Sequence, residues 1–376
     1  MRGPIIRTAA AGDVDAILDL LTHYDLPRAH FEPLYRDDPT YRPEHSWVVD
    51  DGGRLVAHLR VYERSLRLCG GVVRMGGIGN VVTDREARGR GFARLLLERV
   101  CEQLDVEHAV SLLWTHAPRL YAAHGWHPLP QHVVVAQMRR DADAAPLQTV
   151  PGSEDDIADS ESLLERADSA RSGTMPRSAP ARLAQRAWLH EDQGGFRVIR
   201  GDHDRIRAYV RTRTGSPYDI LEVGAMPGDN DAARALLCDV AGDARRIRVT
   251  LPPSLRGVVR DTEIIERPAS QLMLRVCSAA ALCHDLRVPL QERAGEGALT
   301  ISLSAPRGGF QVSISSSSVS VSPMQEHGEL DAAGTARLLL YGSGADGPAL
   351  DDMAQRQALQ RLFPPQDTVI WQSDRF

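Results

Sequence analysis

Residues 79–97 read Gly79-Asn-Val-Val-Thr-Asp-Arg-Glu-Ala-Arg88-Gly89-Arg90-Gly91-Phe92-Ala93-Arg-Leu-Leu-Leu97, which predicts a strand, a loop and a helix in direct succession. Apolar residues recur near the 3.6-residue helical period at Phe92, Leu95, Leu96, Val100 and Leu104. Glycines let the backbone approach a ligand closely, and a helix start presents unpaired N–H groups with a partial positive charge. The stretch therefore predicts a phosphate-binding site.

The spacing within this loop excludes two other phosphate-binding motifs. A Walker A motif needs Gly-Lys-Ser/Thr after a longer loop, and the dinucleotide fingerprint needs Gly-x-Gly-x-x-Gly. Residues 79–97 contain neither. The alternative interpretation is a surface loop with scattered arginines.

Length and charge limit the classes of protein that this chain can be. A chain of 376 residues predicts two or three domains of ~100–200 residues each. The net charge of −6 argues against nucleic acid as the main partner and suits a cationic substrate. No apolar run approaches the ~18 residues of a membrane span, and the N-terminus has no signal-peptide core. We therefore expect a cytoplasmic protein with no membrane partner.

The cysteines predict neither disulfides nor a metal centre. There are five of them, Cys69, Cys101, Cys238, Cys277 and Cys283, an odd number without zinc-ligand spacing. This usage indicates a reducing compartment and no bound metal.

The chain divides into three predicted regions of mixed α/β character. Residues 1–145 alternate strands and helices and contain the glycine loop. Residues 146–280 repeat the strand–strand–helix–strand order but have no Arg-Gly-x-Gly before their helix, so we expect no cofactor there. In residues 281–376, apolar and polar residues alternate at 299–304 and 310–315, as in half-buried strands, and two helices and a C-terminal tail follow.

Two motifs resemble a known enzyme family. The order Arg88-x-x-Gly91-x-Ala93, after a strand ending Val-Val-Thr-Asp, resembles the acetyl-coenzyme A signature of the GNAT N-acetyltransferases, and Tyr121-Ala-Ala-His-Gly125-Trp126 resembles a second family segment. The resemblance implies acetyl-coenzyme A as cosubstrate, with its pyrophosphate held by loop amides. The implied cofactor-binding residues are Val81, Val82, Thr83, Arg88, Gly89, Arg90, Gly91, Phe92 and Ala93.

The order of the three regions resembles the enhanced intracellular survival (Eis) acetyltransferases. That family has an active GNAT domain, a second GNAT-like domain without the cofactor motif, and a C-terminal domain similar to sterol carrier protein. The resemblance implies boundaries near 145 and 280, and a homo-oligomer, a hexamer in that family. The final Phe376 also matches the family.

Acetyl transfer to an amine needs a base, a proton donor for the leaving thiolate, and hydrogen-bond donors for the oxyanion. The resemblance implies Tyr121 as the proton donor; the alternative is a tyrosine that only packs in the core. Residues 73–82 contain no carboxylate, and Asn80 and Arg74 are the hydrogen-bonding side chains there. The Eis resemblance implies that the terminal carboxylate of Phe376 is the base. His116, His124 and His127 are the alternatives, because histidine titrates near neutral pH.

A site that binds a cationic acceptor needs acidic residues in its lining. The resemblance implies that Asp25 lines the acceptor site, with Glu32 nearby and His116 at the end of a strand, although each could be an ordinary surface residue. The sequence thus predicts an acetyl-coenzyme A-dependent N-acetyltransferase acting on a small amine such as a polyamine or aminoglycoside. Two alternatives stay open: a protein lysine or N-terminal acetyltransferase, and a lipid-binding protein whose GNAT domains are relics.

Overall fold

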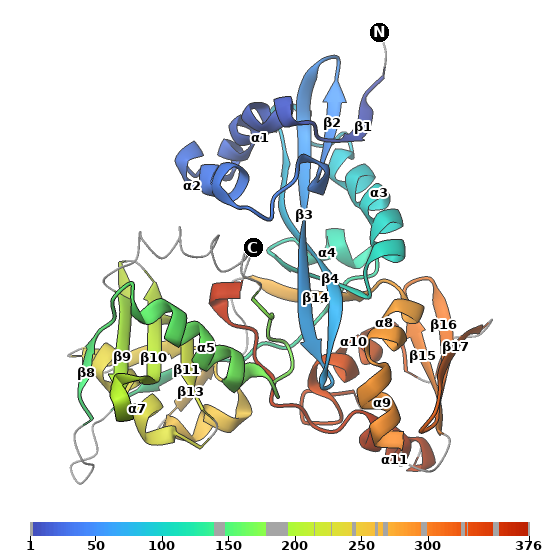
Figure 1. Ribbon diagram of the computed structural model, residues 1–376. Coiled ribbons are helices and arrows are strands. Elements are labelled where there is room, and N and C mark those ends of the chain that lie inside the picture. The colour runs from blue at the N-terminus through green and yellow to red at the C-terminus, as the bar shows by residue number, and fades with distance from the viewer. Residues whose placement is uncertain are drawn as a thin grey trace.

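The structure is a computed structural model that describes residues 3–138, 147–177, 195–213, 215–226, 228–242, 246–259, 262–265, 270–294, 299–324, 328, 330–348 and 353–374. In this part of the chain the strands form two seven-stranded sheets and one three-stranded sheet. Each sheet with its helices is called a unit below, numbered one to three in chain order (Figure 1).

Unit one is a mixed sheet in the order β1-β2-β3-β4-β5-β14-β6. Its strands are β1 (Ile5–Thr8), β2 (Ser46–Asp51), β3 (Arg54–Leu68), β4 (Gly71–Thr83), β5 (Val110–Thr115), β14 (Gln271–Val276) and β6 (His127–Pro128). Its helices are α1 (Val14–Leu21), α2 (Arg28–Glu32), α3 (Phe92–Glu107) and α4 (Pro118–Ala122), with short turns η1 (Ala11–Asp13), η2 (Thr22–Tyr24), η3 (Pro33–Asp37), η4 (Pro43–His45) and η5 (Arg85–Ala87). The predicted motif helix is therefore α3.

Helix α3 forms for the reason that its apolar period predicts. Phe92, Leu96, Val100 and Leu104 are buried, and they pack against strands β3 and β4. Leu95 differs from the expectation, because 37% of its surface is exposed. Leu95 lies at the edge of the apolar face of α3, and a residue at this position of a helix is only partly covered by the core.

Unit two repeats this strand order as β8-β9-β10-β11-β12-β7-β13. Its strands are β8 (Thr149–Pro151), β9 (Phe196–Arg200), β10 (Ile206–Arg213), β11 (Ser216–Ala225), β12 (Arg246–Val249), β7 (Val133–Gln137) and β13 (Thr262–Ile265). Its helices are α5 (Asp156–Asp168) and α7 (Asn230–Ala241), with short turns η7 (Asp202–Asp204) and η9 (Pro253–Val258). Because α5 and α7 occupy the chain positions of α1 and α3, the predicted repeat is present.

The two large sheets exchange a strand. Strand β7 lies before residue 145, in the region expected to form the first domain, but it pairs with β12 of unit two. Strand β14 lies before residue 280, in the region expected to form the second domain, but it pairs with β5 and β6 of unit one. Leu272, Met273 and Leu274 of β14 are buried in unit one. The sheets therefore cross the expected boundaries at 145 and 280, and those boundaries stay a prediction.

Unit three is an antiparallel sheet covered by helices. Its strands are β15 (Leu299–Ala305), β16 (Gly308–Ile314) and β17 (Val319–Met324), and its helices are α8 (Ala279–Asp285), α9 (Arg287–Ala294), α10 (Ala332–Tyr341) and α11 (Met353–Leu362). In β16 the alternation buries Phe310, Val312 and Ile314, as expected. The likeness to sterol carrier protein stays a prediction. No helix among the described residues is long and apolar enough to cross a membrane.

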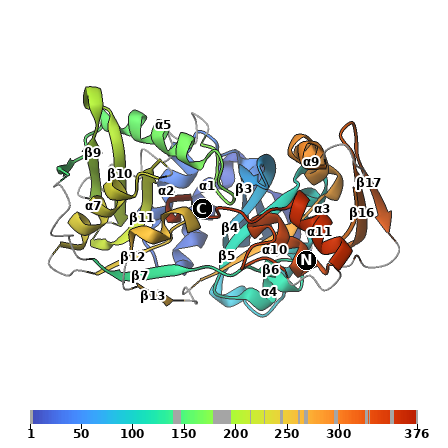
Figure 2. The same ribbon diagram turned by 90° about the horizontal axis from the view of Figure 1, so that it is seen from below.

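The C-terminal segment leaves unit three and runs to unit two (Figures 1 and 2). It ends in the short turn η10 (Gln372–Asp374), which packs against β11. On the way, Val369 and Trp371 enter the apolar core of unit two, and Ile370 enters the core that units one and three share. The segment thus links all three units.

Candidate active site

A bulge in β4 ends the pairing between β4 and β5, and the place where the two strands stop pairing is called the opening below. Strand β4 runs parallel to β5 only from Met75 to Ile78. Asn80 then takes a left-handed backbone conformation (φ +52°), and the register with β3 shifts beside it. Past the bulge, no described strand pairs with β4 on its β5 side, and residues 81–83 therefore lie beside the opening.

The predicted phosphate loop lies directly after this opening. Asp84 begins η5 by accepting a hydrogen bond from the Glu86 N–H (2.8 Å), and Gly91 begins α3 in the left-handed region (φ +81°). A Cβ atom added at Gly89 or Gly91 would meet no atom within 4 Å. The first N–H groups of α3 have no partner within the helix, as at any helix start, and such groups can bind an anion.

Two arginines border this loop. Arg90 lies over the Phe92 ring (4.6 Å from guanidinium carbon to ring centroid) and pairs with Asp51 (2.8 Å). Arg88 is exposed, and its Nε donates to the Thr83 carbonyl (3.4 Å). The residues predicted to bind the cofactor thus lie together, along the end of β4 and the start of α3.

Tyr121 is a buried phenol in α4. It is 7% exposed, and its ring meets Trp126 edge-on with centroids 6.2 Å apart. Burial raises the pKa of Tyr121 to about 12, while a hydrogen bond with Thr115 opposes the shift. The hydroxyl therefore carries its proton throughout the neutral range, which a proton donor requires.

Three more tyrosines surround the β4 bulge, and no sequence motif predicted them. The Asn80 side-chain amide donates to the hydroxyls of Tyr35 (2.9 Å) and Tyr62 (3.0 Å). Tyr24 donates its hydroxyl to the Val81 carbonyl (2.7 Å). Burial raises the pKa of Tyr24, and the nearby hydroxyls of Tyr121 and Tyr62 raise it further.

A buried arginine fixes this cluster. Arg60 is 1% exposed, and its guanidinium lies over the rings of Tyr62 (4.0 Å) and Tyr41 (4.6 Å). It also donates to Asp38 (2.9 Å). Paired and stacked charges of this kind are costly to disturb once one partner is removed. Arg60 thus links Tyr41, Tyr62 and Asp38 next to the β4 bulge.

His58 predicts a pH-dependent stability. Its Nδ1 donates to the Asn80 carbonyl (2.9 Å) and Nε2 accepts from the Ser46 hydroxyl (3.1 Å). Burial lowers the pKa of His58 to about 4, against about 6.5 in an unfolded chain. Between these two pKa values only the unfolded chain binds the proton. The contribution of His58 to the free energy of unfolding is therefore complete above the unfolded pKa. It should be lost at about 1.4 kcal/mol per pH unit as pH falls toward the folded pKa.

Urea unfolding at several pH values tests this dependence. His58→Gln keeps hydrogen-bonding capacity but cannot titrate, so its free energy of unfolding should fall less steeply with acid than that of the wild type. Equal slopes for the two proteins would assign the acid sensitivity to other groups.

The residues predicted to bind the acceptor lie at the surface. Asp25 is exposed and pairs with Arg85, and Glu32 pairs with Arg28 (3.2 Å). His116 is exposed after the end of β5. Among the alternative bases, burial lowers the pKa values of His124 and His127. Phe376 lies outside the described residues.

Unit two has a separate cavity. It measures about 210 Å³ and lies between α5 and strands β10 and β11, with Phe196, Tyr209, Arg211 and Glu222 in its walls. None of the residues predicted from the motifs lines it. The turn before α7 contains Gly228 (φ +90°), but no Arg-Gly-x-Gly precedes the helix.

Possible metal ligands come together once in the described residues. Glu63, Glu107 and His108 each place a ligand atom within 4.8 Å of the others. His108 Nε2 already contacts the Glu63 carboxylate (2.8 Å), and the Gln103 amide donates to Glu107 (2.7 Å). Glu63 thus already pairs with His108 and Glu107 with Gln103, and the group by itself carries no argument for a metal.

Comparisons with known proteins identify similar proteins by sequence and by fold. Residues 5–129 match the family described as an acetyltransferase (GNAT) domain. The fold is similar to a GCN5-related N-acetyltransferase from Kribbella flavida (20% identity, 99% of this chain and 98% of that chain covered, TM-score 0.71). A GCN5-related N-acetyltransferase from Anabaena variabilis (16%, 99% and 100%, 0.72) and Eis1 from Mycobacterium abscessus (16%, 99% and 100%, 0.67) are also similar. No curated protein sequence matches the chain.

These findings confirm the predicted GNAT domain and the mixed α/β fold class. The family match identifies the domain at residues 5–129. The solved structures are at most 20% identical to this chain, so they show a similar fold only. Their coverage of nearly the whole chain shows that the similarity of fold extends beyond unit one.

Proposed function

We propose that this chain transfers the acetyl group of acetyl-coenzyme A to an amine of a small cationic acceptor, because residues 5–129 match a GNAT acetyltransferase domain and the fold of the chain is similar to that of Eis1. The observation that carries this proposal is the opening at the β4 bulge, bordered by the glycine loop and by Tyr121. The net charge of −6 suits a cationic acceptor.

The cofactor-binding residues act through backbone and charge. Residues 81–83 offer backbone groups to the pantetheine arm, and the N–H groups from Gly89 to Ala93 face the pyrophosphate. Arg88 and Arg90 add positive charge at the rim. Coenzyme A supplies the activated acyl group, while the protein supplies position and electrostatics.

In the reaction, the acceptor ammonium first gives one proton to the base. The amine nitrogen then bonds to the thioester carbonyl carbon, and the carbon–sulfur bond breaks. Tyr121 gives its proton to the departing thiolate, and the resulting phenolate takes up the second proton that the amine nitrogen loses, so that the products are a neutral amide and free coenzyme A. The raised pKa of Tyr121 keeps that proton available at neutral pH.

The Phe376 carboxylate is our proposed base, with Asp25, Glu32 and His116 proposed at the acceptor side. An α-carboxylate is a weak base in water, with a pKa of about 3.5. Support for its role comes from the segment before it, which Val369 and Trp371 anchor in the core of unit two. A homo-oligomer stays a prediction.

An acetyl-coenzyme A turnover screen tests the proposed function. Release of free thiol would be followed with polyamines, aminoglycosides, arylamines and lysine peptides as acceptors. Turnover with polyamines or aminoglycosides and none with peptides is the expected result. Turnover with lysine peptides alone would move the function to protein acetylation.

Moving the terminal carboxylate should lower kcat if the Phe376 carboxylate is the base. Deleting Phe376 moves the terminal carboxylate by up to about 3.5 Å, and a C-terminal tag replaces it with a neutral amide. Either change should lower kcat by roughly 10²-fold, as for loss of a positioned base. His116→Ala is the control and should have a mild effect. A fully active tagged protein beside an inactive His116→Ala variant would assign the base to His116.

A further inference from the structure

A second cavity lies where the three units meet, and it measures about 280 Å³. Its lining comes from the crossover between β6 and β7, from β14, from the end of β12 and from η9 of unit two. The end of α10, the turn after it and the C-terminal segment complete the lining. None of the residues predicted from the motifs lines this cavity. It is therefore separate from the opening and from the phosphate loop.

Most of the lining is apolar. Each unit contributes a buried leucine: Leu272 in unit one, Leu251 in unit two and Leu340 in unit three are each at most 2% exposed. Ile370 of the C-terminal segment is 6% exposed and joins them. A ligand of this cavity therefore needs an apolar body, because apolar walls gain little from a polar one.

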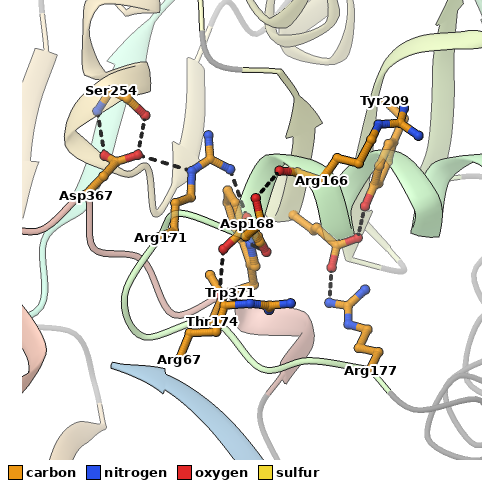
Figure 3. Close-up of polar contacts among 12 residues, drawn as sticks. Arg67, Arg166, Asp168, Arg171, Thr174, Arg177, Tyr209, Ser254, Asp367 and Trp371 are labelled. Carbon is orange, nitrogen blue, oxygen red and sulfur yellow. Dashed lines mark hydrogen bonds and ion pairs between the residues drawn. The ribbon is translucent and has the colours of Figure 1, made fainter. Parts of the chain in front are cut away.

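The C-terminal wall of the cavity is fixed by polar contacts with unit two. Asp367 lies in the stretch of the segment that lines the cavity, and it accepts from the Ser254 N–H (2.9 Å) and from Arg171 (3.2 Å). Trp371, just beyond the lining, donates its indole N–H to the buried Asp168 (2.8 Å). Figure 3 shows Asp367 and Trp371 held in this way. This wall therefore has a fixed position.

Two polar side chains of the lining lack hydrogen-bond partners. The Oε1 atom of Gln131 and the Nε atom of Arg256 are both buried, and neither has a partner among the described residues. A buried polar atom without a partner costs free energy unless a ligand or a water molecule reaches it. Gln131 and Arg256 are therefore the polar groups that a ligand of this cavity would satisfy.

The charges of the lining favour an anion. Three of its residues can carry charge, namely His132, Arg256 and Asp346. His132 Nε2 and Asp346 Oδ1 lie 2.9 Å apart, and Arg337 donates to the Asp346 backbone carbonyl (2.8 Å). Among the described residues, no carboxylate forms an ion pair with Arg256. A guanidinium without an acid partner, beside apolar walls, attracts an anionic group.

We infer that this cavity binds a small organic carboxylate, with the carboxylate on Arg256 and Gln131 and the apolar body against the leucines. The guanidinium fork matches two carboxylate oxygens. Gln131 donates to the same group when its amide is turned so that the NH2 takes the place of Oε1. A neutral ligand would leave the charge of Arg256 unpaired, and a cation would find Asp346 already paired. The volume suits an acid with a single ring or a branched chain.

Isothermal titration calorimetry with phenylacetate tests this inference. Phenylacetate has one ring and one carboxylate, and phenylacetamide has the same ring with a neutral amide. Phenylacetate should bind at one site per chain and raise Tm, because a ligand that binds only the folded chain stabilises it. Phenylacetamide should bind about 10–100-fold more weakly, as for a lost hydrogen bond to a charged group. Equal affinities, or no binding of phenylacetate at millimolar concentrations, would overturn the inference and leave the cavity to water.

Three variants locate the bound phenylacetate. Arg256→Gln removes the charge and should raise Kd by about 10–100-fold. Ala345→Trp puts a large ring at an exposed position of the lining, so it should block the cavity without disturbing the buried core. Arg205→Gln is the matched control, because Arg205 is an exposed arginine of unit two outside the lining, and its Kd should equal that of the wild type. Thermal unfolding without ligand shows that each variant is folded. Wild-type affinity in Arg256→Gln or Ala345→Trp would overturn the assignment of this cavity.

These titrations measure binding, so their outcome is independent of the proposed acetyl transfer. A chain that binds phenylacetate in this way but shows no turnover of acetyl-coenzyme A would keep the carboxylate site and lose the proposed function. A chain with turnover but without phenylacetate binding would lose only the carboxylate site.

Discussion

Gly91→Glu should abolish measurable binding of coenzyme A while leaving the fold intact. Gly91 begins α3 with a φ of +81°, and a side chain there would enter open space. A carboxylate at this position would place negative charge where the helix start attracts an anion. Backbone strain at a non-glycine residue with positive φ adds about 1–3 kcal/mol, so the variant should remain folded. Isothermal titration calorimetry with coenzyme A measures the loss of binding.

Gly215→Glu is the matched control for Gly91→Glu. Gly215 also has a positive φ (+72°) and open space around it, but it lies in unit two. Both variants add the same negative charge and a similar backbone strain. The difference between them is therefore which loop is altered. Coenzyme A binding should be normal in Gly215→Glu. Unchanged affinity in a folded Gly91→Glu protein would defeat the assignment of the phosphate loop.

Tyr121→Phe should lower kcat by about 10²–10⁴, the usual range for a general acid. The ring would still pack on Trp126, so stability and coenzyme A affinity should change little. Because the pKa of Tyr121 is about 12, the wild-type rate should also show no loss from its ionisation up to pH 10. Single-turnover measurements report the chemical step itself and exclude slow product release.

Tyr24→Phe provides the comparison for a neighbouring phenol. The Tyr24 hydroxyl already donates its proton to the Val81 carbonyl (2.7 Å), so it has none free for a thiolate. We expect its loss to lower kcat by less than about tenfold, through a small shift of β4. A Tyr121→Phe enzyme with near-normal single-turnover rate would leave Tyr121 with a packing role. A larger loss in Tyr24→Phe would transfer the acid role to Tyr24.

The largest difference between sequence pattern and structure is the exchange of β7 and β14. Residues 271–276 follow unit two in the chain, and so their pattern assigned them to that unit. The structure pairs β14 with β5 of unit one over six residue pairs. Period and propensity describe which face of a strand is apolar, whereas the choice of partner depends on every strand that competes for the same sheet edge.

Part of the candidate site was also predicted from the sequence, and part became apparent only in the structure. Motifs predicted the loop from Arg88 to Ala93, and the structure places these residues together at the start of α3. No motif marked Tyr24 or Tyr62, which reach the opening from η2 and β3. The cavity between the three units likewise brings together residues from Pro130 to Ile370, beyond the range of any local spacing rule.

The sequence by itself determined the phosphate loop, the helix that follows it, the repeated strand–helix order and the position of Tyr121 after Pro118. These features are local, because backbone conformation and apolar periodicity are set by residues within a few positions of one another. Only the tertiary structure decided which strands share a sheet and which phenols surround Asn80. Those contacts form when distant segments bury apolar surface together, and local sequence does not encode which surfaces will meet.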